Sequence, residues 1–487
     1  MTNKHHHLHD IVVLGVGRVL QALIMVGTVR VMTEVLPASE LGRYYLFLAV
    51  YTFFGLVFIN PVGQYINRKT NYWDKTGQLH QRLYDYSYFV LLVSGVSSLV
   101  LFGATTMGIT TALSGWVFLV VMPLFVFFNT WANTLLPLLN MLLFRKTFVA
   151  LTVLMAMSIL VVPYLSTRAD PTAANWLLGM SVGYGMMAFV GLAFFTRLRK
   201  LSRPWQRNPL HYEMRLWWRF GSFVVPLALA TVFMWFQASG FRIMIESFFS
   251  LEYLAYLGVG LTLATQMGSA LEGLVSQFYH PLYYRAIEGV GQAERAAALE
   301  DAAFMVAPVY TIFFFSVAAF ADEFFRVLVA SEFQSAYNFL IIGMVFEYFR
   351  MMTNLYANAS HSEMKTLRLV FPYVLGAFVA VFAVIFGWVI GDHYYITPVI
   401  WAAGMLVTFG ATFISAKNLL GVSLPTIPII RGFIWSVPIL VASWLLDDRI
   451  SSIYGVLGVL FVLGVYGLFA VFLCTRVGIN ARNHSSA

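Results

Sequence analysis

The chain has 487 residues, of which 60% are apolar and 11% are charged, and its mean hydropathy is +0.77. Soluble domains carry about 25% charged residues, so this composition excludes a set of soluble domains and predicts an all-α polytopic membrane protein. A single cysteine, Cys474, excludes an intrachain disulfide and a cysteine-based zinc site.

Apolar runs of about 20 residues, the length needed to cross a bilayer, predict about 14 transmembrane helices. The thirteenth run is the shortest. The predicted spans are 11–36, 44–66, 86–108, 115–143, 147–165, 175–196, 219–246, 254–280, 302–321, 336–359, 369–391, 398–416, 432–446 and 452–474.

The basic residues lie mainly on one side of these spans. With the N-terminus inside, 22 of the 30 Lys and Arg residues fall in inner segments and four in outer loops. This asymmetry follows the positive-inside rule and predicts that both termini are cytoplasmic. The net charge of +8 therefore reflects topology and contact with anionic lipid, and we reject nucleic-acid binding.

One sequence pattern occurs twice, at a constant offset of 212 residues. Arg30-x-Met32-x-Glu34, followed by Glu40 and Tyr44, returns as Arg242-x-Met244-x-Glu246, followed by Glu252 and Tyr256. Each copy ends an apolar run, and both runs cross the membrane in the same direction. We infer an internal duplication, in which two lobes form a parallel repeat about an axis along the membrane normal.

The repeat predicts the domain organisation. Residues 1–205 form an N-terminal six-helix lobe, and residues 206–420 form a C-terminal six-helix lobe. Residues 421–487 form a terminal helix pair with a cytoplasmic tail. The basic, tryptophan-containing loop 197–219 joins the lobes as an interfacial helix.

A charged side chain within the bilayer is costly, so each one needs a partner or a wet cavity. Arg18 shares a helical face with Gln21 and Thr28. Its side chain either extends to the inner membrane surface or faces a cavity. The polar face of the helix continues to Thr28, beyond the reach of the arginine side chain, and this favours the cavity.

Three predicted spans carry polar side chains along one face. A polar face toward lipid is excluded on cost, so we expect these faces to line one central cavity, or else to form a structural network. The predicted lining residues are Asn60 and Gln64 in the second span, Asn129 and Asn133 in the fourth, and Glu347, Arg350 and Asn354 in the tenth.

Glu272 is the most isolated acid in the sequence. The offset of 212 aligns it with the neutral Asn60, and no basic residue lies within two turns of it. Because burial favours the neutral carboxyl group, we expect Glu272, or otherwise Glu347, to bind and release a proton or a sodium ion. A neutral Glu272 bonded to a neighbouring helix is the structural alternative.

The duplicated charges predict an outer gate. Arg30 and Glu34 are four residues apart, as are Arg242 and Glu246, so each couple could pair within its own helix. The symmetry axis allows a crossed arrangement instead, in which Arg30 pairs with Glu246 and Arg242 with Glu34 to close the outer mouth in the inward-open state.

Catalytic motifs and cofactor sites are not found in the sequence. There is no Gly-Lys-Ser/Thr phosphate loop, and Gly15-x-Gly17 lies inside a span, where close helix packing explains it. The sequence predicts no catalytic residues, no metal site and no cofactor, and the protein is expected not to be an enzyme.

Residues around both copies of the repeat resemble the polysaccharide (O-antigen type, Wzx-like) flippase family of the MOP exporter superfamily. The first lobe carries the resemblance in Arg30–Tyr44, and the second in Trp218–Pro226 followed by Arg242 and Tyr256. One departure is Phe241, where the family usually has an acid before the arginine; Glu246 could substitute for it.

The resemblance implies a flippase of the bacterial inner membrane that takes part in polysaccharide biosynthesis. Its substrate would be a polyprenyl-diphosphate-linked oligosaccharide, moved to the outer leaflet by alternating access, and other polysaccharide-assembly proteins would be possible partners. Arg18 and Arg350 would bind the diphosphate, and Gln21, Asn60, Gln64, Asn129, Asn133 and Asn354 would bind the glycan.

Two alternatives remain open at this point. A multidrug or organic-cation antiporter of the same superfamily would favour an acidic cavity without arginines. A membrane glycan polymerase or ligase would favour a substantial outer loop with Arg or His, whereas the outer loops hold only four arginines and His393.

Overall fold

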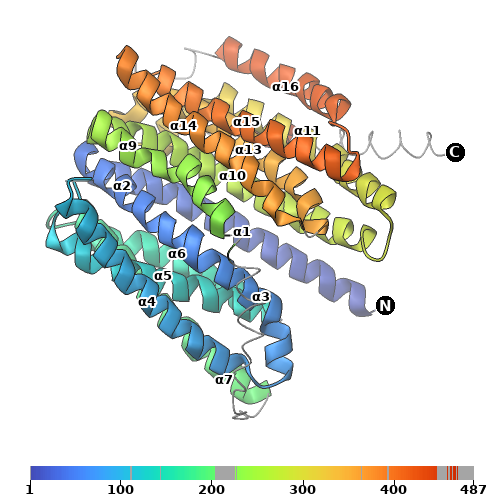
Figure 1. The fold of residues 1–487 in the computed structure, drawn as a ribbon, viewed down its shortest axis with the longest axis horizontal. Helices are drawn as coiled ribbons and strands as arrows, with labels where there is room; N and C mark the ends of the chain where they lie inside the picture. The colour runs from blue at the N-terminus through green and yellow to red at the C-terminus, as the bar shows by residue number, and fades with distance from the viewer. Residues whose placement is uncertain are drawn as a thin grey trace. The chain divides into compact units, whose positions relative to one another are not determined.

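The computed structural model describes residues 2–109, 112–142, 144–202, 228–363, 365–391 and 394–446, with Val225 and some residues between 458 and 469. Within these ranges all regular secondary structure is helical (Figure 1). Twelve of the described helices are long and apolar enough to cross a membrane. This confirms the predicted all-α, multi-pass membrane fold.

The observed helices match the predicted spans closely, with one informative difference. The tenth predicted span is a 26-residue helix, Tyr337–Ser362, but it is not among the twelve apolar helices of the described part. Its polar side chains lower its hydropathy. The thirteenth span is present and starts earlier, at Thr426. The fourteenth, 452–474, falls almost wholly outside the described residues.

The chain divides into two compact units, Met1–Ala255 and Tyr256–Ala487. The first unit contains α1 (Thr2–Val35), α2 (Ala38–Phe54), the π-helix η1 (Gly55–Ile59), α3 (Asn60–Lys75), α4 (Leu79–Thr106), α5 (Trp116–Met141), α6 (Arg145–Ser166), α7 (Ala173–Ser202), the π-helix η2 (Phe236–Gly240) and α9 (Phe241–Phe248).

Aromatic side chains fill the interior of the first unit. Phe125 of α5 lies 4.8 Å from the Tyr51 ring of α2 and 5.7 Å from the Tyr184 ring of α7, both edge-on. Such edge-to-face contacts add to the free energy gained by burying the rings. The indole nitrogen of Trp235 donates to the Ala49 carbonyl at 2.8 Å, which ties the span Ala228–Phe248 to α2.

The second unit holds the remaining helices. They are α10 (Leu251–Ala286, which starts in the first unit), α11 (Gln292–Ala319), α12 (Ala321–Leu328), the 3-10 helix η3 (Ser331–Ala336), α13 (Tyr337–Ser362), the 3-10 helix η4 (Thr366–Leu369), α14 (Val370–Ile390), α15 (Ile396–Leu420) and α16 (Thr426–Leu446).

Helix α13 lies at the centre of the second unit. Its residues Met351, Leu355 and Tyr356 belong to a buried cluster with Tyr310 of α11 and Ala416 of α15. The α13 and α15 helices are also joined by rings of Phe346 and Trp401, which stack at 4.2 Å. A polar helix is therefore surrounded by apolar ones, which shield its charges from lipid.

The two copies of the sequence repeat follow the same local path. In the first, α1 ends at Val35 and α2 begins at Ala38; in the second, α9 ends at Phe248 and α10 begins at Leu251. Glu40 and Glu252 each fall in the first turn of the new helix, where an acid stabilises the helix dipole. This shared path supports the inferred duplication.

The predicted lobe boundary at 205/206 lies outside the described residues, as does most of the predicted interfacial helix at 197–219. The compact units divide later, between Ala255 and Tyr256. The boundaries of the three predicted domains therefore stay predictions.

Candidate functional site

An arginine held by two acids lies between α10 and α13 in the second unit. Arg350 Nε donates to Glu347 Oε2 at 2.8 Å, and its Nη2 lies 2.7 Å from the same oxygen, an ion-pair contact without hydrogen-bond geometry. Arg350 Nη1 lies 2.8 Å from Glu272 Oε2 on α10. One guanidinium thus bridges two carboxylates from different helices.

Neutral side chains complete the hydrogen bonding of both acids. Thr265 Oγ1 donates to Glu347 Oε1 at 3.0 Å, and Asn354 Nδ2 donates to Glu272 Oε1 at 2.8 Å. Each carboxylate therefore has a neutral donor on one oxygen and Arg350 on the other. Buried charges need such full pairing to be tolerated.

The two acids differ in exposure. The Glu347 side chain is 2% exposed, whereas Glu272 is 21% exposed and Arg350 is 24% exposed. Glu347 is thus a sealed counterion, and Glu272 and Arg350 form the accessible side of the cluster.

Small residues on α10 allow the two helices to approach closely enough for these contacts. A side-chain carbon added at Gly260 would lie 2.6 Å from Phe339, and one added at Gly268 would lie 2.7 Å from Glu347 Oε2. On α13, one added at Gly343 would lie 2.7 Å from Ala264. This seam of small residues, a common device in membrane helix pairs, brings the Glu347 carboxylate against the α10 backbone.

Further titratable groups face the cluster from three helices. Tyr279 and His280 on α10, Tyr310 on α11 and Tyr373 on α14 all lie within electrostatic range of Glu272. The hydroxyl groups can donate hydrogen bonds to an anion or a carboxylate. The three tyrosines are buried, so they form part of the protein interior around the cluster.

The structure changes the interpretation of Glu272 and Arg350. The sequence suggested that Glu272 is isolated, which is wrong, because Arg350 reaches it from another helix. Spacing along one helix cannot reveal such a partner. It follows that Arg350 is not a free cation in this structure, and a diphosphate would have to compete with Glu272 for it.

The polar stripe predicted on α13 divides into two parts. Glu347, Arg350 and Asn354 meet α10 in the charged cluster, as described above. Asn358 is buried, and its Nδ2 donates to the backbone carbonyls of Asn354 and Leu355 at 3.2 and 3.1 Å. Asn358, one turn beyond Asn354, is thus hydrogen-bonded within its own helix.

In the first unit, the predicted binding residues occur in pairs. Arg18 Nη1 donates to Gln21 Oε1 at 3.3 Å, and its guanidinium lies 5.9 Å from the Phe148 ring. The other two pairs are Gln64 with Asn60, at 3.4 Å, and Asn133 with Asn129, at 3.2 Å. Their roles in substrate binding stay predictions.

Of the predicted gate residues, Arg30 and Glu34 pair within one helix, whereas Arg242 contacts an aromatic ring on another helix. Arg30 forms an ion pair with Glu34 at 2.6 Å within α1. The Arg242 guanidinium lies 5.6 Å from the Tyr45 ring, and Glu246 Oε2 accepts a hydrogen bond from Ser247 at 3.4 Å. In this structure Arg30 therefore pairs with Glu34 of its own helix. The crossed pairing of Arg30 with Glu246 stays a prediction for another conformation.

Several residues of these sites were not anticipated from the sequence. Tyr51 donates to Asn129 Oδ1 at 2.6 Å, and Thr265 binds Glu347. The π-helices η1 and η2 directly precede Asn60 and the Phe241–Arg242 pair. Single turns of π-helix are often found at functional sites, but no residue pattern in these spans would have revealed them.

The described residues hold no group of three or more His, Cys, Asp or Glu side chains that could bind a metal ion.

Solved structures provide the comparison with known proteins, since neither a family model nor a curated protein matches the sequence. A structure of the lipid II flippase MurJ, in an inward closed conformation, matches with a TM-score of 0.65 at 12% identity, over 96% of this chain and 98% of that chain. Outward-facing and inward-facing structures of a multidrug resistance MATE family transporter of the MOP superfamily match with TM-scores of 0.49 and 0.48, at 13% and 11% identity, over 84% of this chain and 96% of theirs. The chain therefore has the fold of the lipid II flippase structure along nearly its whole length.

Proposed function

We propose that this protein is a flippase that moves a polyprenyl-diphosphate-linked oligosaccharide from the cytoplasmic to the outer leaflet by ion-coupled alternating access. The observation that carries the proposal is Arg350, a partly accessible arginine among membrane-spanning helices. A guanidinium binds phosphate oxygens through paired, charge-assisted hydrogen bonds. The shared fold with a lipid flippase structure supports the proposal.

The charge of the cluster supports ion coupling. With both acids ionised, Arg350, Glu272 and Glu347 carry one positive and two negative charges. A net charge within a membrane is costly, so we infer that a proton or a sodium ion supplies the second positive charge during part of the cycle.

Exposure identifies the acid that would exchange this ion. Glu347 is sealed and is bonded by Arg350 and Thr265, so it remains the permanent counterion of the arginine. Glu272 is accessible and shares Arg350 with it. Ion exchange at Glu272 changes the charge beside Arg350 without breaking the buried pair.

The ion pair between Arg350 and Glu272 determines whether cation binding strengthens or weakens substrate binding. Neutralising Glu272 removes one of the two anions that compete for Arg350, and so favours binding of a diphosphate. Because coupling between two sites is reciprocal, a bound diphosphate in turn favours binding of the cation at Glu272. Substrate affinity should therefore rise as the pH falls, or as the sodium concentration rises.

A second candidate function is export of organic cations. The specific observation in its favour is that acids outnumber arginine in the cluster. Here the proton and the substrate would compete for Glu272, so substrate affinity would fall as the pH falls. The opposite sign of the pH dependence distinguishes the two functions.

The direct test is flipping of a fluorescent polyprenyl-diphosphate oligosaccharide in proteoliposomes. Loss of the charge-assisted contacts in Arg350→Gln should weaken substrate binding by about 10- to 100-fold. Arg18→Gln tests the other predicted cation in the same way. Arg326→Gln is the matched control, because Arg326 forms an exposed ion pair with Asp322 and should flip normally.

Arg350→Gln leaves the buried Glu347 and the partly exposed Glu272 without their cationic partner, which destabilises the protein. The double variant Arg350→Gln/Glu347→Gln keeps the charge of the cluster closer to neutral and separates the two effects. If this variant is folded and still flips the lipid at the wild-type rate, Arg350 does not bind the substrate and the proposed site is wrong.

A further inference from the structure

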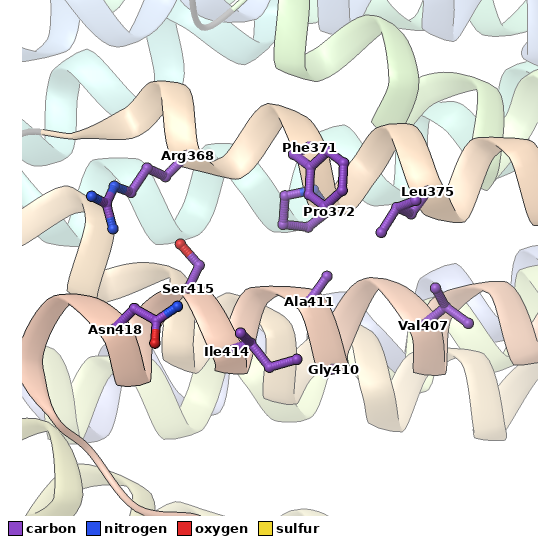
Figure 2. Close-up of a pocket in the computed structure, with 10 residues that line it drawn as sticks. All are labelled: Arg368, Phe371, Pro372, Leu375, Val407, Gly410, Ala411, Ile414, Ser415 and Asn418. Atoms are coloured by element: carbon purple, nitrogen blue, oxygen red, sulfur yellow. The ribbon is translucent and has the colours of Figure 1, made fainter.

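A groove with a cavity volume of 640 Å³ lies between α14 and α15, and none of its lining residues belongs to the charged cluster. Figure 2 shows its ends: Arg368, Ser415 and Asn418 lie together at one, and Leu375 and Val407 lie at the other. The groove is thus polar at one end and apolar along the rest.

The packing of the two helices explains why the groove exists. A side-chain carbon added at Gly404 would lie 3.2 Å from the Gly376 carbonyl oxygen, so α14 and α15 touch there. Toward the end of α15 they leave a gap, since the same carbon added at Gly410 meets nothing within 4 Å. Gly410 and Ala411 line this gap and are too small to fill it.

The length of the groove corresponds to one leaflet. From Val407 to Asn418, α15 rises about 16 Å, at 1.5 Å per residue, and half of a bilayer's hydrocarbon core is about 15 Å thick. The helices touch at Gly376 and Gly404, close to Leu375 and Val407, so the groove ends there. The groove therefore fits an acyl chain of an ordinary membrane lipid.

The polar end of the groove is basic. Arg368 is exposed, and within the described part of the chain its side chain has no ion pair. Lys365 and Lys417 are exposed and lie within three residues of lining residues. The nearby acid Glu363 is neutralised by Arg295 at 2.8 Å. A lipid phosphate at this end would meet positive charge together with the neutral donors of Ser415 and Asn418.

We propose that this groove binds one anionic phospholipid of the cytoplasmic leaflet, with its phosphate at Arg368 and an acyl chain between α14 and α15. The leaflet follows from the predicted topology, which places the start of α14 on the inner side. This site is separate from the proposed transport site and does not depend on the flipped substrate.

The test is lipid binding to the purified full-length chain, counted by native mass spectrometry. The probes are palmitoyl-oleoyl phosphatidylglycerol and phosphatidylcholine with the same acyl chains. Both lipids carry the phosphate, but phosphatidylcholine adds a quaternary ammonium that the basic end of the groove disfavours, so phosphatidylglycerol should bind about tenfold more tightly. Arg368→Gln should remove this preference, and Gly410→Leu, which fills the groove, should weaken binding of both lipids.

Two control variants make the result specific. Arg326→Gln removes an arginine far along the sequence from the groove, and Gly95→Leu adds a leucine at an exposed glycine of α4 with nothing within 4 Å. Both should bind phosphatidylglycerol as the wild type does. Equal binding of the two lipids to the wild type, or unchanged binding by Arg368→Gln and Gly410→Leu, would overturn the proposal.

A polyprenyl phosphate serves as a competitor in the same experiment. If it displaces phosphatidylglycerol at equal concentration, and Gly410→Leu abolishes its binding, the groove holds a prenyl chain and the phospholipid assignment is wrong. If it leaves phosphatidylglycerol in place, the assignment is supported.

Discussion

At the scale of single residues, two glutamates with the same chemistry have different environments. Glu347 is sealed against α10, and Glu272 is accessible, although both contact Arg350. We predict that Glu272→Gln retains substrate binding, and loses the dependence of binding on pH or sodium. The amide keeps the size of the side chain and cannot take up a cation as a carboxylate does. Binding of the labelled lipid-linked substrate over a range of pH and sodium concentration is the measurement.

Glu347→Gln is the comparison for this prediction. It removes the buried counterion of Arg350, so it should lower the free energy of unfolding by about 3–5 kcal/mol, the cost of breaking a buried pair. The molecules that still fold should bind the substrate with the wild-type dependence on pH. If Glu272→Gln keeps the wild-type pH dependence and Glu347→Gln loses it, the two roles are reversed.

The sequence predicted part of this site, and the missing part has a physical reason. Glu347, Arg350 and Asn354 were found because three- and four-residue spacing places them on one face of a helix. The Arg350–Glu272 pair joins residues 78 positions apart on two helices. Nothing in the spacing of either helix shows which face packs against the other.

At the scale of secondary-structure elements, the seam of small residues between α10 and α13 positions the charged cluster. We predict that Gly268→Ala destabilises the protein by about 1–3 kcal/mol, the usual effect of overpacking. The added carbon would lie 2.7 Å from Glu347 Oε2 and 3.2 Å from its Cβ, so Glu347 would have to move. Thermal unfolding of the purified protein and substrate flipping measure the two consequences.

The matched control for this prediction lies on the same helix. Gly273 has nothing within 4 Å of its added carbon, so Gly273→Ala should leave stability unchanged or raise it slightly, because alanine favours the helix. Equal unfolding temperatures for Gly268→Ala and Gly273→Ala would show that the seam does not hold the cluster in place.

At the scale of the whole molecule, composition and hydropathy predicted the architecture well. Long apolar runs specify membrane helices because every backbone polar group must be satisfied inside the segment, and twelve such helices were found among the described residues. The exception is α13, whose charges make it too polar for that class. A polar helix can span the membrane only when apolar neighbours surround it, as α11 and α15 do here. The element that hydropathy identifies least clearly is thus the one that carries the candidate site.

The orientation of the chain in the membrane is a further prediction at this scale. Because 22 of 30 basic residues lie on one side, that side should face the cytoplasm. In a variant whose native Cys474 is replaced by serine, Ser331→Cys should react with a membrane-impermeant thiol reagent in intact cells. Lys75→Cys should react only after the membrane is permeabilised, and both residues are exposed, so burial does not limit either reaction. The opposite labelling pattern would place Arg368 and its groove in the outer leaflet and would reverse the direction of flipping proposed here.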